Sequence, residues 1–208
     1  TKGRKKKKYN LDQTFVNRII TKDINIKIKD NNILDIGSGS GENSIYQSMK
    51  FPKSKIIACE IFLDGNINLY HEIIQKNIHN IMIYNGNVLE LFDTMREKNI
   101  FDSIWMLFPD PWPKKRHHKN RLIQASFLRR LGERVEEGGE LCFRTDYGPY
   151  FDWTRELIDS SSDWRIDSKR AWPFEEETFF ESLLGEYQSL VAVRGEGLGC
   201  SVNHFKLL

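Results

Sequence analysis

The sequence has little of what marks secreted, zinc-binding or membrane proteins. Its three cysteines, Cys59, Cys142 and Cys200, are widely spaced and form no Cys-x-x-Cys pair, so we expect neither a disulfide framework nor a zinc site. No apolar run approaches the ~20 residues that a membrane span needs. The residues after the basic N-terminus are too polar for the apolar stretch of a signal peptide. These absences favour a cytoplasmic protein without a membrane partner.

The sequence also lacks net charge, although its charges are segregated. Lys and Arg number 31 against 29 Asp and Glu, which gives a formal net charge of +2. Residues 1–8 carry +6 and residues 114–134 carry +7, which leaves −11 on the rest of the chain. Two basic segments on an acidic body indicate an anionic partner. We expect residues 1–8 to be a disordered basic arm and residues 9–208 to form a single domain.

Short apolar runs alternate with segments of helical spacing over most of the chain. The pattern predicts strands at residues 33–36, 55–60, 81–84, 101–108 and 140–145, and helices at about 11–20, 41–49, 65–77, 121–135 and 150–160. Such alternation is typical of a doubly wound α/β fold with a mostly parallel sheet. The last forty residues are rich in strand patterns and glycine turns, so we expect antiparallel strands at one sheet edge.

A glycine-rich loop follows the first predicted strand. Gly37, Gly39 and Gly41 alternate with serines, and Asp35 stands two residues before the first glycine. These glycines allow a tight turn and a close approach of backbone amides to a ligand. A dinucleotide fingerprint requires glycine at the position of Glu42, so a nicotinamide dehydrogenase is disfavoured. The carboxylate favours a ligand with an amino group, and the alternative is a plain strand-to-helix turn.

Two more polar residues stand at the ends of predicted strands. Glu60 ends the second strand, where a carboxylate can accept hydrogen bonds from both ribose hydroxyls. Asn87 follows the third strand and is placed to contact an adenine edge, although a turn asparagine is about as good an explanation. Together with Asp35 and the glycine loop, these positions describe a site for S-adenosylmethionine.

The segment after the fourth strand, Phe-Pro-Asp-Pro-Trp at residues 108–112, presents Asp110 between two prolines that fix the backbone. Asp110 is therefore the candidate catalytic residue. The basic and imidazole side chains that follow it are Lys114, Arg116, His117, Lys119 and Arg121. This pattern is typical of phosphate and base binding, although a run of charges is often only a solvated surface. The histidines have no acidic or cysteine partner at ligand spacing, so we expect no metal. Asp146 ends the fifth strand and would face the same cleft, or would cap the next helix.

These motifs resemble those of the bacterial tRNA (guanine-N7-)-methyltransferases. The resemblance covers about residues 33–207. It rests mainly on residues 108–121, supported by the glycine loop, Glu60, Thr-Asp-Tyr at residues 145–147 and Arg-Gly-x-x-Leu-Gly at residues 194–199. It implies a Rossmann-like, S-adenosylmethionine-dependent enzyme that methylates N7 of a guanosine in the tRNA variable loop (position 46) and releases S-adenosylhomocysteine.

The resemblance also implies roles for individual residues. Asp35, Glu60, Asn87 and Asp110 would contact the methyl donor together with the three glycines, and the substrate would be bound by Lys114, Arg116, His117, Lys119, Arg121, Asp146 and Ser189. A monomer and a homodimer both remain open. The chain departs from the family pattern at Ala192, where a glutamate is usual, and at Gly148 and Asn120. Two alternatives therefore stay open, a non-catalytic tRNA-binding relic and a methyltransferase acting on another base or an amine.

Overall fold

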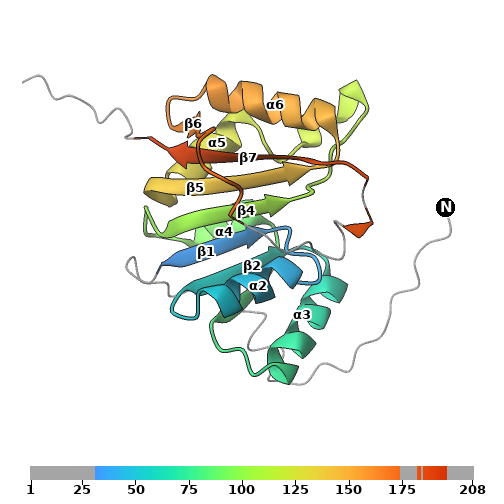
Figure 1. Cartoon of the computed structure of the whole chain (residues 1–208), viewed down its shortest axis with the longest axis vertical. Coiled ribbons are helices and arrows are strands. Elements are labelled where there is room, and N and C mark those ends of the chain that lie inside the picture. The colour runs from blue at the N-terminus through green and yellow to red at the C-terminus, as the bar shows by residue number, and fades with distance from the viewer. Residues whose placement is uncertain (1–30, 174–181, 184, 196–208) are drawn as a thin grey trace, which may run out of the picture.

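The computed structural model describes residues 31–173, 182–183 and 185–195. Its strands form one sheet of seven strands in the order β3-β2-β1-β4-β5-β7-β6 (Figure 1). The strands are β1 (Asn32–Ile36), β2 (Lys55–Glu60), β3 (Ile81–Asn85), β4 (Phe101–Leu107), β5 (Val135–Thr145), β6 (Trp164–Ile166) and β7 (Gln188–Arg194). The first five strands pair in parallel, whereas β7 pairs antiparallel with β5 and β6. The predicted mixed sheet with an antiparallel C-terminal edge is confirmed.

Helices cover both faces of this sheet. They are α2 (Glu42–Lys50), α3 (Leu63–Gln75), α4 (Val88–Thr94), the 3₁₀ helix η1 (Lys115–Asn120), α5 (Ala125–Gly132) and α6 (Gly148–Asp159). Alternate strand residues point to opposite faces. One set packs with α3 and α2, and the other packs with α4, α5 and α6 (Figure 1). The two apolar layers of a doubly wound fold result. The predicted basic arm and the helix at residues 11–20 lie outside the described residues.

The sequence prediction missed α4 and β6, and two other elements differ from it markedly in their bounds. The helix expected at 121–135 is limited to Ala125–Gly132, because residues 115–120 form the separate turn η1 and Arg121 is buried against other elements. Strand β5 begins at Val135 rather than at residue 140 and passes through Gly138, whose φ is +77°. Glycine tolerates that angle, so a pattern that suggested a turn lies inside an irregular strand.

Cys59 and Cys142 are buried free thiols, as expected for core packing, and Cys200 lies outside the described residues. In the ranges that the structure describes, no helix is both long and apolar enough to cross a membrane. Because β1, β2 and β4 are parallel, their carboxyl ends share one edge of the sheet. The strands that follow β1 in the chain extend the sheet to one side, and those that follow β4 extend it to the other side. Ligands bind at such a reversal of strand order in open α/β sheets.

Candidate functional site

The loop between β1 and α2 depends on its glycines. Gly37, Gly39 and Gly41 have φ angles of +73°, +55° and +84°, a region that other L-residues rarely adopt. A Cβ atom on Gly41 would also lie 2.4 Å from a methyl carbon of Leu69 on α3. On Gly37 or Gly39, by contrast, a Cβ atom would meet nothing within 4 Å. The loop therefore combines tight packing at the start of α2 with open space beside its first two glycines.

Glu60, the last residue of β2, connects this loop to the next strand. Its side chain accepts hydrogen bonds from the backbone N–H groups of Gly39 at 3.0 Å and Phe62 at 2.8 Å. Asn66 on α3 is fully buried, and its amide donates to the carbonyl of Glu60 and to the side chain of Asn85. A carboxylate has about four acceptor positions, so two backbone bonds orient Glu60 and leave capacity for ligand hydroxyls.

Asp35 lies beneath the glycine loop. It is 2% exposed and accepts a hydrogen bond of 2.6 Å from the Ser44 hydroxyl on α2. Burial raises the pKa of Asp35 to about 6, and the hydrogen bond from Ser44 lowers it in part. Asp35 is absent from the lining of the neighbouring cavity, and its side chain is instead bonded to the first turn of α2.

A cavity of about 450 Å³ opens at the carboxyl edge of the sheet. Four of the predicted donor-binding residues line it together: Gly37, Glu60, Asn87 and Asp110. Its apolar walls come from Ile36, Ile61, Phe62, Val88, Leu107 and Leu122. The side chain of Asn87 also caps α4 by accepting from the N–H of Leu89 at 2.8 Å. Both explanations of this residue, a local cap and a lining residue, therefore apply.

The loop that carries Asp110 has an unusual backbone. Phe108 and Trp112 have φ angles of +50° and +43°, which are rare for bulky residues and cost on the order of 1–3 kcal/mol each. The backbone N–H of Phe108 donates to the carbonyl of Arg144 at 2.8 Å, and the ring of Trp112 packs against His117. These contacts hold the loop while Asp110 is exposed. The prolines predicted a rigid loop, but they gave no signal for the left-handed residues.

The basic segment after this loop divides into two parts. Lys114, Arg116 and Lys119 are exposed on and beside η1. Arg121 instead is 2% exposed, and its guanidinium donates to the carbonyl of Pro111 at 2.9 Å.

The Arg121 guanidinium carbon also lies 5.0 Å from the ring centre of Tyr150 and 5.2 Å from that of Trp153. Its interior position differs from the exposed position that a phosphate contact requires. Cation–π contacts and a hydrogen bond inside the fold stabilise the positive charge of this buried guanidinium. Arg121 therefore anchors the Asp110 loop in this structure.

Asp146 and Ser189 lie on the other side of the loop, where β5 ends and β7 begins. Asp146 lines a separate cavity of about 710 Å³ together with Glu186, Tyr187 and Gln188. The expectation that Asp146 shares one cleft with Asp110 therefore differs from what is seen, because the two residues line separate cavities. The alternative N-cap role is also not observed, since the N-cap of α6 is Tyr147, without a side-chain hydrogen bond. Ser189 accepts a hydrogen bond of 2.8 Å from Arg144.

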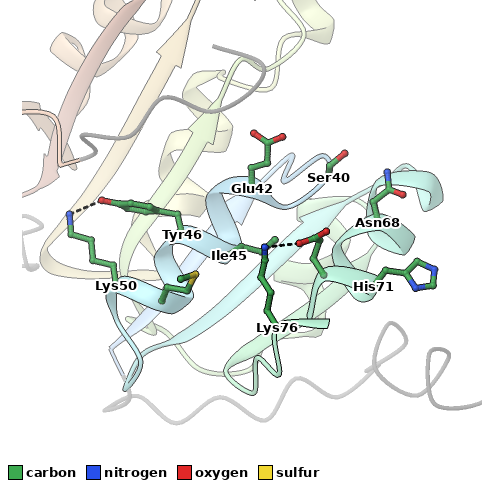
Figure 2. A pocket seen from close by; sticks show the side chains of 10 residues that line it. Ser40, Glu42, Ile45, Tyr46, Lys50, Asn68, His71 and Lys76 are labelled. Atoms are coloured by element: carbon green, nitrogen blue, oxygen red, sulfur yellow. Dashed lines mark hydrogen bonds and ion pairs between the residues drawn. The ribbon is translucent and has the colours of Figure 1, made fainter. Parts of the chain in front are cut away.

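A larger cavity of about 930 Å³ lies between α2 and α3 (Figure 2). None of the predicted site residues lines it. Its charged side chains are largely paired with neighbours on the same helix, Lys50 with Tyr46 at 3.1 Å and Lys76 with Glu72 at 2.9 Å (Figure 2). We therefore place the chemistry at the carboxyl edge of the sheet, where polar groups from several strands converge.

The sequence reasoning missed Asn66, Arg144, Glu186 and Tyr187. Asn66 and Arg144 are polar residues inside apolar patterns, a signal that could have marked them as buried and functional. Glu186 and Tyr187 gave no such signal. Among the described residues, no group of three or more His, Cys, Asp or Glu side chains could hold a metal ion.

This chain is similar in sequence to known methyltransferases. Residues 29–197 match a family model described as "Putative methyltransferase". A tRNA (guanine-N(7)-)-methyltransferase from Corynebacterium diphtheriae is 33% identical over 144 residues, which are 69% of this chain and 54% of that protein. This chain spans between 54 and 65% of the length of the first curated relatives that it matches.

Solved structures with the same fold include two methyltransferases. The precorrin-6y C5,15-methyltransferase of Geobacter metallireducens has a TM-score of 0.58 and 13% identity, over 80% of this chain and 81% of that one. A Streptococcus mutans protein described as "a putative methyltransferase", solved in complex with SAH, has a TM-score of 0.53 and 13% identity, over 81% and 91% of the two chains. At these identities the likeness shows a shared Rossmann-like fold, as the alternating strands and helices predicted.

Proposed function

The chain belongs to the methyltransferase family whose model matches residues 29–197, and we propose that it transfers the methyl group of S-adenosylmethionine to N7 of a guanosine in tRNA. The observation that carries the proposal is the cavity in which Gly37, Glu60, Asn87 and Asp110 meet. The curated relatives share the name of that activity. From the resemblance to the tRNA (guanine-N7-)-methyltransferases, we also propose that the acceptor is the variable-loop guanosine at position 46 and that the protein works in the cytoplasm. We further propose that residues 9–208 form one domain.

The residues around the cavity fit the methyl donor. Open space beside Gly37 and Gly39 leaves room for a ligand against the loop backbone. Glu60 is already oriented by two backbone bonds and would accept from the ribose hydroxyls, while Asn87 would contact adenine between apolar walls. Asp35 would favour the amino group of the methionine moiety through its charge. The donor supplies an electrophilic methyl group on a sulfonium.

Methylation of guanine N7 requires no general base. N7 has a free lone pair and carries no proton, so the protein must align the nucleophile with the methyl group and exclude water. Asp110, fixed between prolines and exposed at the donor cavity, would stand beside the reacting purine, and Asp146 in its own cavity would accept from the N1–H and amino edge of guanine. A nearby carboxylate also stabilises the positive charge that develops on the purine.

The tRNA would be held by the basic segment next to Asp110. Lys114, Arg116 and Lys119 are exposed within ten residues of that carboxylate, and His117 contacts the ring of Trp112 in the same loop. Phosphate contacts at this place would set the register of the RNA on the donor cavity. Glu60 and Asp110 lie at the cavity and the basic residues beside it, an arrangement by which a chain of almost no net charge would bind RNA.

Incubation with labelled S-adenosylmethionine and unmodified tRNA, followed by nucleoside analysis, tests the proposal. We expect label in N7-methylguanosine. Label in another nucleoside would favour a different methyltransferase specificity. Donor binding without transfer would favour the non-catalytic relic, the alternative that the alanine at position 192 suggested. Ala192 is fully buried in β7 opposite Leu141, so the side chain at this position lies in the core.

A further inference from the structure

We propose that Tyr187 and Glu186 form, with Asp146, the site for the acceptor base, in which Tyr187 is the surface on which the purine stacks and Glu186 binds the purine's amino group. The inference rests on the proposed function and deepens it by naming residues for the acceptor. It assigns a role to the segment before β7, which none of the sequence motifs identified.

The cavity at the end of β5 has the composition of a base-binding site. It is lined by Asp146 and Glu186, which carry carboxylates, by the phenol ring of Tyr187, and by Gly148 at the start of α6. Asp146 follows β5 and Glu186 precedes β7. The pairing of Thr145 with Gln188 therefore brings the two carboxylates to the same edge of the sheet from opposite directions.

Tyr187 is held in place by the neighbouring strand. The guanidinium carbon of Arg144 lies 4.6 Å from the Tyr187 ring centre and 4.1 Å from that of Trp172. Arg144 is 7% exposed and also donates to Ser189 at 2.8 Å. One face of Tyr187 is thus packed on a buried cation, yet the residue is 36% exposed. A rigid aromatic ring with an accessible surface is what base stacking uses.

Tyr187 also contacts a residue that lines the donor cavity. Its ring contacts that of Phe108 edge to face, with the ring centres 5.8 Å apart. Phe108 lines the donor cavity and Tyr187 lines the acceptor cavity. A purine stacked on Tyr187 would therefore lie beside the loop that carries Asp110. Direct transfer needs the two substrates to meet at such a boundary.

The carboxylates explain how guanine would be chosen. Guanine presents two donors on one edge, N1–H and the exocyclic amino group, and a carboxylate accepts from both. Adenine has a bare N1 there, which a carboxylate repels. Glu186 lines the same cavity as Asp146 and supplies a second acceptor. The site then needs no carboxylate from position 192, which lies in the core.

Substitution of Tyr187 tests the stacking surface. We expect Tyr187→Phe to keep kcat/KM for tRNA within about twofold, and Tyr187→Leu to lower it about ten- to hundredfold, as loss of one base–aromatic stack does. Donor affinity, measured by calorimetry, should stay unchanged in both. Tyr46→Leu on α2 is the matched control. Unchanged kcat/KM in Tyr187→Leu would overturn the stacking role. A parallel loss of donor affinity and thermal stability would also overturn it, because such a loss would show that Tyr187 has a structural role instead.

Replacement of the target guanosine by inosine tests Glu186. Inosine keeps N7 and N1–H and lacks the amino group, so the unmodified enzyme should prefer guanosine by about tenfold or more. Glu186→Gln should reduce that preference to near unity, while Glu156→Gln on α6 should keep it. Full preference in Glu186→Gln would exclude Glu186 as the group that binds the amino function. If the unaltered protein methylates no guanosine, the proposed function fails. If it does and these variants behave as wild type, the acceptor site alone fails.

Discussion

The carboxylate of Glu60 accepts a hydrogen bond of 3.0 Å from the backbone N–H of Gly39. This contact joins the end of β2 to the loop that follows β1, two segments that lie side by side in the sheet. The other carboxylate oxygen is bound by the N–H of Phe62. The proposed ribose-binding group is therefore oriented before a donor arrives, which reduces the ordering cost of binding.

Glu60→Gln should weaken donor binding. A glutamine amide has only one acceptor oxygen, so its NH₂ group would face a backbone N–H and the side chain would turn or the loop would shift. We expect the dissociation constant for S-adenosylmethionine to rise at least about tenfold, the effect of losing a hydrogen bond to a charged group. Calorimetry measures this directly. The exposed Glu90→Gln on α4 is the control, and an unchanged affinity in Glu60→Gln would contradict the assignment.

Asp110→Ala should abolish methyl transfer without unfolding the protein. The side chain is exposed and lies between two prolines that hold the backbone, so its removal should change the melting temperature by no more than about two degrees. Transfer to tRNA should fall by a factor of about 100 or more, since a group at the reaction centre is lost. Single-turnover assays with bound donor measure the step. Wild-type turnover would remove Asp110 from the mechanism.

The basic segment should separate into RNA-binding and structural residues. Joint replacement of Lys114, Arg116 and Lys119 by alanine should weaken tRNA binding. It should also flatten the slope of log K against log salt by about two to three, because up to three phosphate contacts are lost. The melting temperature should be unaffected, since these side chains are exposed. Filter binding across salt concentrations measures the slope. A slope equal to that of wild type would make the segment a plain solvated face.

Arg121→Ala should behave in the opposite way. The guanidinium is buried, bonded to Pro111 and packed on Tyr150 and Trp153, so its loss should lower the free energy of unfolding by about 2 kcal/mol or more. Denaturant unfolding measures this change. The salt slope of the folded fraction should equal that of wild type. A stable variant with a reduced slope would instead support a direct RNA contact for Arg121.

Asp35 should make stability depend on pH. Burial raises its pKa from the ordinary 3.8 to about 6, so the folded state favours the protonated carboxyl. Its contribution to stability is fully present below about pH 4 and is lost as the pH rises through about 6, by up to about 3 kcal/mol. Asp35→Asn has no such loss. Its stability relative to wild type should therefore improve between pH 4 and pH 7 in denaturant titrations. The exposed Asp159→Asn should show no trend, and a pH-independent difference for Asp35→Asn would refute the buried carboxyl.

The order of strands and helices followed from local patterns, and so did the parts of the donor site that stand at strand ends. Glu60 ends a parallel strand, and Asn87 and Asp110 follow such strands, and parallel strands place their carboxyl ends at one edge. Periodicity could not place Asp35, which stands one residue before the end of β1 and is turned into the core by the side-chain alternation of the strand. The Phe-Pro-Asp-Pro-Trp segment predicted a rigid loop, but the left-handed Phe108 and Trp112 are set by contacts with Arg144, Tyr187 and His117.

The sequence by itself determined the doubly wound sheet, the glycine loop and the link between Asp110 and a basic segment, because each depends on residues close together in the chain. The tertiary structure decided which charged side chains are accessible to a ligand and which are buried. Arg121 has the same charge as Arg116, but it is enclosed by two aromatic rings and a carbonyl. Glu186 reaches the cavity of Asp146 only because β7 pairs antiparallel with β5. Burial and strand pairing are long-range properties, so no local pattern could assign these roles.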